Sequence, residues 1–294
     1  MRSCGVRPRG LRRRGAWSPV LLAAFLAASI GVTAFTAAAS VSVSGKLTHE
    51  KEAQPGETYE SLIYISNTGD EAEQVKVYQT DYLFSCDGKY FYDEPGQNSR
   101  SNAGWITFGP SRLTISPRGS SIINYSVKVP TDQNLVGTYW SIIMVEVVSK
   151  ASPEVTSAHD GQAKLGIDQV FRYGVQIVTH IGTTGQRKLK FIDTRLLKEV
   201  GGRVLEVDLE NTGERWLRPS LWTELYDTAG TYVGKFEAGT LRIYPGTSVR
   251  YKVDLTKVEK GDYKAVVIAD CGADDVFGAT FSLSVENEDT STGN

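Results

Sequence analysis

The sequence contains few of the residues from which enzymes build active sites. Its 294 residues include three histidines and three cysteines, and these are scattered along the chain. It has no nucleophile elbow, no H-E-x-x-H motif, no phosphate-binding loop and no paired-cysteine zinc motif. The sequence therefore predicts a protein that is not an enzyme, with no metal, no cofactor and no small-molecule substrate.

Cysteine is also too scarce to form a disulfide framework. Cys4 lies in the basic N-terminal segment, which leaves Cys86 and Cys271, one in each half of the remaining chain. A disulfide between them would have to join the two halves, whereas two separate thiols need no such contact. The sequence leaves both arrangements open.

Clustered basic charge is confined to the start of the chain. Six arginines lie between Arg2 and Arg14, and without them the formal net charge moves from −2 to about −8. No basic patch with interleaved aromatic residues occurs elsewhere. An acidic chain without such a patch is a poor match for nucleic acid, so we expect no nucleic-acid partner.

Residues 1–39 have the pattern of a secretory signal peptide. The arginines precede an apolar run that extends from residue 20 to 38, and Ala37–Ala39 offers an A-x-A cleavage site. An uncleaved membrane anchor is the alternative that a run of this length allows, but Gly31 and the small residues at its end favour cleavage. We therefore expect an exported protein, without a membrane anchor after cleavage. The polar tail, residues 287–294, is expected to be disordered.

The rest of the chain has the periodicity of strands. No stretch shows a sustained helical period, and apolar residues alternate with polar ones in short runs. Asp87-Gly88, between two such runs, predicts a β-hairpin. Two segments recur in the same order: Asn67-Thr68-Gly69 with Asn211-Thr212-Gly213, and Gly137-x-Tyr139 with Gly261-x-Tyr263. The spacing between copies shrinks along the chain, as expected for two copies of one fold whose loops differ in length. The sequence predicts two tandem β-sandwiches, at residues 41–182 and 187–286.

Turn and strand residues in the first sandwich form a more specific pattern. It consists of Pro110-Ser111-Arg112, Leu113, Ile115, Pro117-Arg118-Gly119 and a strand with Tyr125, Val127 and Val129. The pattern resembles the N-terminal immunoglobulin-like domain of periplasmic pilus-assembly chaperones, over roughly half of the chain after the signal. The resemblance implies an all-β protein with two tandem immunoglobulin-like sandwiches, whose partners are protein subunits of a pilus or surface structure. It also implies that the protein is periplasmic or secreted, in a bacterial cell envelope.

The last strand of the first sandwich is where the resemblance implies partner binding. Leu165 and Ile167 alternate with Gly166 and Asp168 and precede a further alternating run. In the chaperones, this strand is an edge whose apolar side chains complete the unfinished sandwich of a pilus subunit, and backbone hydrogen bonds supply affinity. An ordinary strand that contributes to its own core is the alternative.

The resemblance also implies a pair of charges that hold the partner's terminal carboxylate. A desolvated carboxylate needs such partners. The matching positions are Lys51 and Arg172, with lysine and arginine exchanged relative to the chaperones. The candidate partner-binding residues are thus Lys51, Leu165, Ile167 and Arg172. The competing hypothesis is a structural or adhesive tandem module of the cell envelope, in which the edge strand is merely covered.

Overall fold

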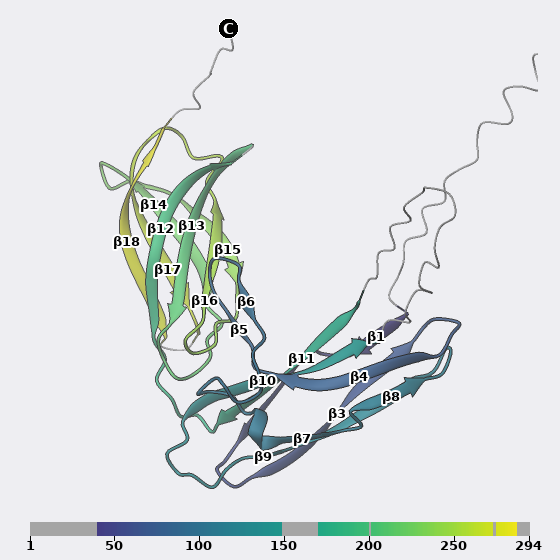
Figure 1. Cartoon of the computed structure of the whole chain (residues 1–294). Helices are drawn as coiled ribbons and strands as arrows, with labels where there is room; N and C mark the ends of the chain where they lie inside the picture. The colour runs from purple at the N-terminus through teal and green to yellow at the C-terminus, as the bar shows by residue number, and fades with distance from the viewer. Residues whose placement is uncertain (1–39, 149–169, 200, 273–274, 287–294) are drawn as a thin grey trace, which may run out of the picture. The chain divides into compact units, whose positions relative to one another are not determined.

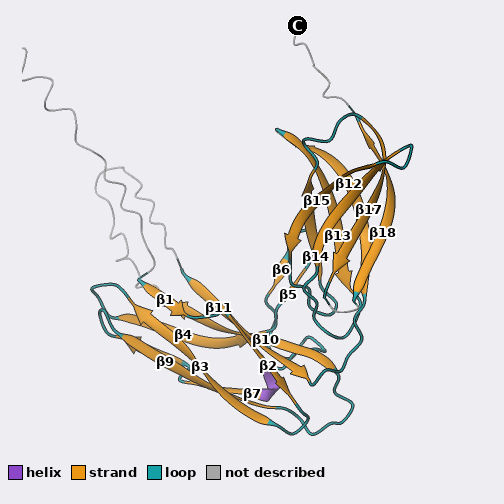
Figure 2. Ribbon diagram, turned by 180° about the vertical axis from the view of Figure 1, so that it is seen from behind, coloured by secondary structure: helices purple, strands orange, loops and turns teal. Residues whose placement is uncertain are grey.

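Strands make up nearly all of the regular structure, which confirms the all-β prediction. The computed structural model describes residues 40–148, 170–199, 201–272 and 275–286, and within them the single helical element is the short 3-10 turn η2 (Ala103–Trp105) (Figure 2). The predicted signal peptide, the predicted tail, and Leu165 and Ile167 lie outside the described residues. No helix in these ranges is long and apolar enough to cross a lipid bilayer.

The first sandwich consists of two sheets and a small hairpin. One sheet has the order β1 (Val41–Ser44), β3 (Thr58–Asn67), β9 (Ser120–Lys128) and β7 (Ile106–Gly109). The other has the order β2 (Thr48–Ala53), β11 (Arg172–Ile181), β10 (Gly137–Val147), β4 (Glu73–Thr80) and β8 (Arg112–Ile115) (Figure 1). The hairpin pairs β5 (Leu83–Phe84) with β6 (Tyr90–Phe91), across the Asp87-Gly88 turn that the sequence suggests.

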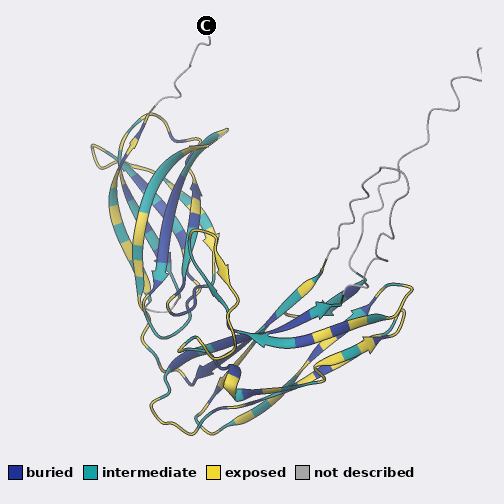
Figure 3. Cartoon of the chain, viewed as in Figure 1, coloured by how far each residue is buried: buried dark blue, intermediate teal, exposed yellow. Residues whose placement is uncertain are grey.

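The core of this sandwich lies between the two sheets (Figure 3). Alternate residues of each strand are buried there, because successive side chains of a strand point to opposite faces. The buried side chains include Ile63, Ile65, Ile123, Tyr125 and Val127 from one sheet and Val75, Val77, Ile143, Val145, Val175 and Ile177 from the other. Burying each such side chain contributes about 1.5–3 kcal/mol relative to leaving it exposed.

The second sandwich repeats this plan with seven strands. One sheet has the order β12 (Leu189–Glu199), β13 (Gly202–Asn211) and β16 (Ser248–Asp254). The other has the order β15 (Tyr232–Thr240), β14 (Ser220–Asp227), β17 (Gly261–Asp270) and β18 (Val276–Val285). Its separate core includes Leu205, Val207, Leu209, Leu221, Leu225, Val253 and Val267. The described strands therefore form two sandwiches, each with its own core.

The repeated Asn-Thr-Gly segment performs the same task in both sandwiches. Asn67 is buried, donates to the carbonyls of Glu71 and Ile115 and accepts from the N–H of Gly69. Asn211 is buried too, donates to the carbonyls of Arg215 and Ile243 and accepts from the N–H of Gly213. Each side chain thus satisfies backbone groups that would otherwise be buried without partners. The sequence repeat therefore reflects a duplicated structural element.

The chain changes sheets between β1 and β2. β1 pairs antiparallel with β3, whereas β2, four residues later, pairs parallel with β11 in the other sheet. Gly45 allows this change because its φ of +94° lies in a region that residues with a side chain rarely adopt. The crossing determines how much of β11 pairs with β2 along the edge that faces away from β10.

Candidate functional site

β11 is paired along its whole length on one side and along only part of its length on the other. Its antiparallel ladder with β10 runs from Arg172 opposite Glu146 to Ile181 opposite Gly137. Its parallel ladder with β2 begins only at Gln176. Within the described chain, no strand pairs with residues 172–175 on the β2 side. We call this stretch the open edge.

Backbone groups of two residues face the open edge. The N–H of Gln176 donates to the carbonyl of Leu47 at 2.8 Å, which shows that Gln176 directs its backbone groups to the β2 side. Alternate residues of a strand direct their N–H and C=O groups to the same side. The corresponding groups of Gly174 and Arg172 therefore face the open edge, where an added strand could pair with them.

The side chains of the open edge follow the pattern of a half-buried strand. Val175 is fully buried in the core, and Tyr173 packs against that core and donates its hydroxyl proton to the carbonyl of Val41 at 2.7 Å. Gly174 and Arg172 lie on the opposite face. The inner face therefore holds β11 in place, which leaves its backbone edge rigid and ready for pairing.

Arg172 is exposed and already has an acidic partner. Its Nε donates to Glu146 at 2.7 Å, and the Tyr78 hydroxyl donates to the same carboxylate oxygen at 2.7 Å. The hydrogen bonds from Tyr78 and Arg172 hold the pKa of Glu146 below its usual range, so the carboxylate stays ionised. Arg172 is thus fixed beside the open edge by a charge on β10.

The structure does not bring Lys51 and Arg172 together. Lys51 lies opposite Thr179 on β11, seven positions beyond Arg172 and therefore roughly 23 Å away along the strand. Lys51 also alternates with Glu50 and Glu52 on β2, so it lies on the face opposite theirs. The two charges cannot hold one carboxylate in this arrangement. The partner-binding roles of Leu165 and Ile167 remain predictions, since both residues lie outside the described ranges.

A charged and aromatic cluster that the sequence did not indicate lies at the far end of β11. The ring of His180 stacks on Trp216 at 5.6 Å between centroids, and the guanidinium of Arg242 lies 4.5 Å from the centre of the same indole. Arg242 donates to Glu50 at 2.6 Å. His180, Glu50, Trp216 and Arg242, which we call the junction, join the first sandwich to the second. No local sequence signal marks these residues, because they meet only after both sandwiches have formed.

His180 is neutral in the junction. Burial, together with the charges of Arg215 and Arg242, lowers its pKa to about 4. The Thr138 hydroxyl oxygen accepts from the backbone N–H of Trp216 at 3.0 Å and lies 2.9 Å from Nδ1 of His180. The other ring nitrogen, Nε2, lies 4.0 Å from a carboxylate oxygen of Glu50. A protonated imidazolium at this position would face two guanidinium groups.

We expect the free energy of unfolding to fall as the pH drops from about 6.5 to about 4. In this window the unfolded chain binds a proton at His180, whose ordinary pKa is 6.5, while the folded chain keeps the imidazole neutral. The expected loss is on the order of 2–3 kcal/mol. Urea unfolding at several pH values measures it in the wild type and in the His180→Gln variant, both of which retain the background from His49. If the free energy of unfolding fell equally with decreasing pH in the two proteins, this role of His180 would be contradicted.

Aromatic residues cover the outer face of β11 next to the junction. Trp140 stacks on Tyr244 of the second sandwich at 4.6 Å with an interplanar angle of 12°, and its indole N–H donates to the carbonyl of Tyr82 at 2.7 Å. The Tyr244 hydroxyl donates to Gln176 at 2.6 Å, and Val178 is buried in the same cluster. The outer face of β11 is therefore covered from Gln176 onward, the residue at which its pairing with β2 also begins.

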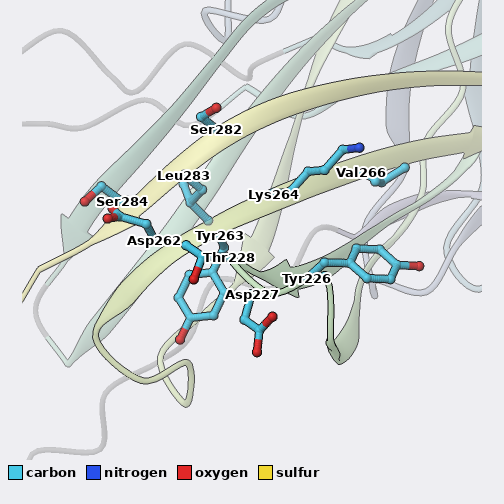
Figure 4. Close-up of a pocket in the computed structure, with 11 residues that line it drawn as sticks. Tyr226, Asp227, Thr228, Asp262, Tyr263, Lys264, Val266, Ser282, Leu283 and Ser284 are labelled. Carbon is cyan, nitrogen blue, oxygen red and sulfur yellow. The ribbon is translucent and has the colours of Figure 1, made fainter.

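Two cavities of the described chain could also hold a ligand. The larger, about 760 Å³, is in the second sandwich and is lined by Asp227, Tyr226, Tyr263, Asp262 and Lys264 among others (Figure 4). Asp227 is already occupied by hydrogen bonds from the N–H groups of Ala229 and Thr231 in its own turn. A second cavity of about 410 Å³ lies beside the β5–β6 hairpin and has aromatic walls.

Within the described residues no three acidic, histidine or cysteine side chains gather to hold a metal ion, and Cys86 and Cys271 are both free thiols.

No protein-family model matches the chain, and no curated protein matches it. Solved structures similar to it include the class 5 fimbriae chaperone CfaA, at 10% identity over 84% of this chain and 100% of that one, with a TM-score of 0.43. A chaperone–tip adhesin complex of CFA/I fimbriae matches at 11% identity over 83% of this chain and 98% of that one, with a TM-score of 0.44. The CsuC–CsuE pre-assembly complex of Acinetobacter baumannii matches at 14% identity over 82% of this chain and 98% of that one, with a TM-score of 0.42. All three similarities are remote.

Proposed function

We propose that the exported chain is a non-enzymatic, chaperone-like protein that binds partner subunits by β-strand addition during assembly of a pilus or surface structure. The observation that carries the proposal is the open edge of β11. A strand paired on one side and free on the other offers backbone donors and acceptors to an extended segment of a second protein. The partner's side chains would then determine the register.

The open edge has the properties that strand capture requires. Its inner side chains are anchored in the core, and its backbone groups at Arg172 and Gly174 face away from β10. β2 and the aromatic cluster with Trp140 and Tyr244 cover β11 from Gln176 onward. A captured strand would therefore pair over residues 172–175 and continue along the run that contains Leu165 and Ile167 in the sequence. This placement gives Arg172 a role beside the partner, whereas Lys51 lies outside it.

Ile167→Asp tests the predicted contacts of the alternating run. If Ile167 inserts into an apolar groove of the partner, an unpaired carboxylate there costs several kcal/mol, and capture should fall by a factor of about 100 or more. Gly166→Asp is the matched control, since it adds the same charge one position away, where the alternation turns it to the other face. The measurement is recovery of partner proteins from envelope extract by the tagged, exported chain.

The outcomes separate the proposal from its rival. Loss of recovery with Ile167→Asp and retention with Gly166→Asp is the expected result. Equal recovery of the same proteins by the wild type and both variants would contradict strand addition and would favour a structural or adhesive module.

A further inference from the structure

The last strand of the second sandwich is a long and unprotected edge. β18 pairs with β17 without a register break, from Val276 opposite Asp270 to Val285 opposite Gly261. In the described part of the chain no strand pairs with its other side (Figure 1). Alternate residues of this regular ten-residue strand therefore present free backbone donors and acceptors on that side.

β18 lacks the charges, prolines, bulges and short length by which proteins protect such edges. Natural edge strands carry charges, prolines or bulges, or are very short. The other described edge strands longer than four residues all carry charges, which are Lys190, Asp193, Arg195, Lys198 and Glu199 on β12, Lys235 and Glu237 on β15, Arg250, Lys252 and Asp254 on β16, and Glu50, Lys51 and Glu52 on β2. β12 and β15 also contain register shifts. β18 reads VFGATFSLSV, with neither charge nor proline.

The sandwich is open beside this strand. A cavity of about 500 Å³ lies between β12 and β18. Its walls include Leu196, Phe281 and Leu283 together with Leu205 and Ala265, which belong to the buried core. An edge strand that borders an opening into the core has apolar surface to bury as well as backbone groups to pair.

We propose that β18 pairs antiparallel with β18 of a second copy of this chain, so that the two four-stranded sheets become one. A register centred on Thr280 places side chains of the same face opposite each other, with Phe277 opposite Leu283 and Ala279 opposite Phe281. Because the strand is uncharged, this symmetric pairing sets no like charges against each other. The aromatic ring of Phe277 from the copy would lie beside Leu283, at the opening between β12 and β18.

The chain's own C-terminal residues do not fit this position. The residues after Glu286 read NEDTSTGN and include no apolar side chain, so they cannot fill an apolar opening. A second β18 supplies both an alternating apolar face and an uncharged backbone edge. The inference does not depend on the function proposed for β11.

Introducing a charge of either sign at Thr280 tests the pairing. Thr280 is exposed and, in the proposed register, faces its own copy. Sedimentation equilibrium of the exported wild-type chain should show a monomer–dimer equilibrium. Thr280→Lys and Thr280→Glu should each raise the dimer dissociation constant about fivefold or more, because like charges then lie directly opposite. Thr107→Lys, on the edge strand β7 of the first sandwich, should leave it unchanged.

Mixing the two variants distinguishes pairing from damage to the fold. An equimolar mixture of the lysine and glutamate variants should dimerise at least as tightly as the wild type, since opposite charges now meet. A wild-type chain that stays monomeric at high concentration would overturn the proposal and would favour pairing of β18 with a strand of a different protein. Variants that dimerise like the wild type, or a mixture that does not regain dimers, would overturn it as well.

Discussion

Gly174→Pro is expected to weaken partner capture about tenfold or more while leaving the free protein folded. Gly174 lies in the middle of the open edge, and its N–H faces away from β10, so the proline removes a donor that no strand uses in the described chain. Proline is tolerated at such positions because the missing N–H faces solvent. In the complex the same N–H would pair with the added strand, and its loss leaves a buried acceptor of the partner unsatisfied, which costs about 1–3 kcal/mol before the clash of the ring is counted. Capture should therefore fall about tenfold or more.

Gly174→Ala is the matched control for this variant. A Cβ at position 174 meets Ile142 Cγ2 at 3.2 Å and Met144 Sδ at 3.4 Å, and both substitutions add that atom. Only the proline lacks the N–H. Recovery of partner proteins should therefore be close to the wild type with alanine and largely lost with proline. The same recovery with both variants would contradict pairing at the open edge.

Trp140→Ala is expected to lower the free energy of unfolding by about 3–5 kcal/mol. The side chain is fully buried, stacks on Tyr244 and donates to the carbonyl of Tyr82. Its removal leaves a large cavity where the two sandwiches meet and an acceptor without its donor. Urea unfolding followed by circular dichroism measures the loss.

Trp222→Ala provides the comparison for Trp140→Ala. Trp222 is half-buried on β14, where its ring lies 4.4 Å from the ammonium of Lys235 and its N–H donates to Glu224. Such surface contacts contribute about 1 kcal/mol or less. Losses of similar size for the two variants would show that Trp140 does not connect the sandwiches as described.

The alternation of apolar residues was sufficient to predict the fold class and several local elements. The hairpin across Asp87-Gly88 forms where expected, because turn chemistry and flanking strands are encoded locally. The repeat of Asn67 as Asn211 is matched by the same set of hydrogen bonds, because a duplicated turn needs the same side chain in both copies. These features depend on residues close together in the sequence.

The candidate site was predicted less completely, because it depends on how distant strands align. Counting along the sequence placed Lys51 and Arg172 in one clamp, but the parallel register of β2 on β11 separates them. That register follows from the sheet change at Gly45, which no alternation pattern reveals. Glu50, the neighbour of Lys51, instead meets Arg242 from the second sandwich, and a contact between residues so far apart in the sequence has no local signal. The described part of the alternating strand was recognised, but only the structure shows which part of its edge is free.

Amide hydrogen exchange of β11 tests the central claim most directly. In the free protein, the N–H groups of Arg172 and Gly174 should exchange rapidly, whereas those of Tyr173 and Val175, which face β10, should be protected. On capture of a partner subunit, strand addition predicts strong new protection of Arg172 and Gly174 and no change at Tyr173 and Val175. A saturated complex in which Arg172 and Gly174 still exchange as rapidly as in the free protein would contradict the proposed mechanism.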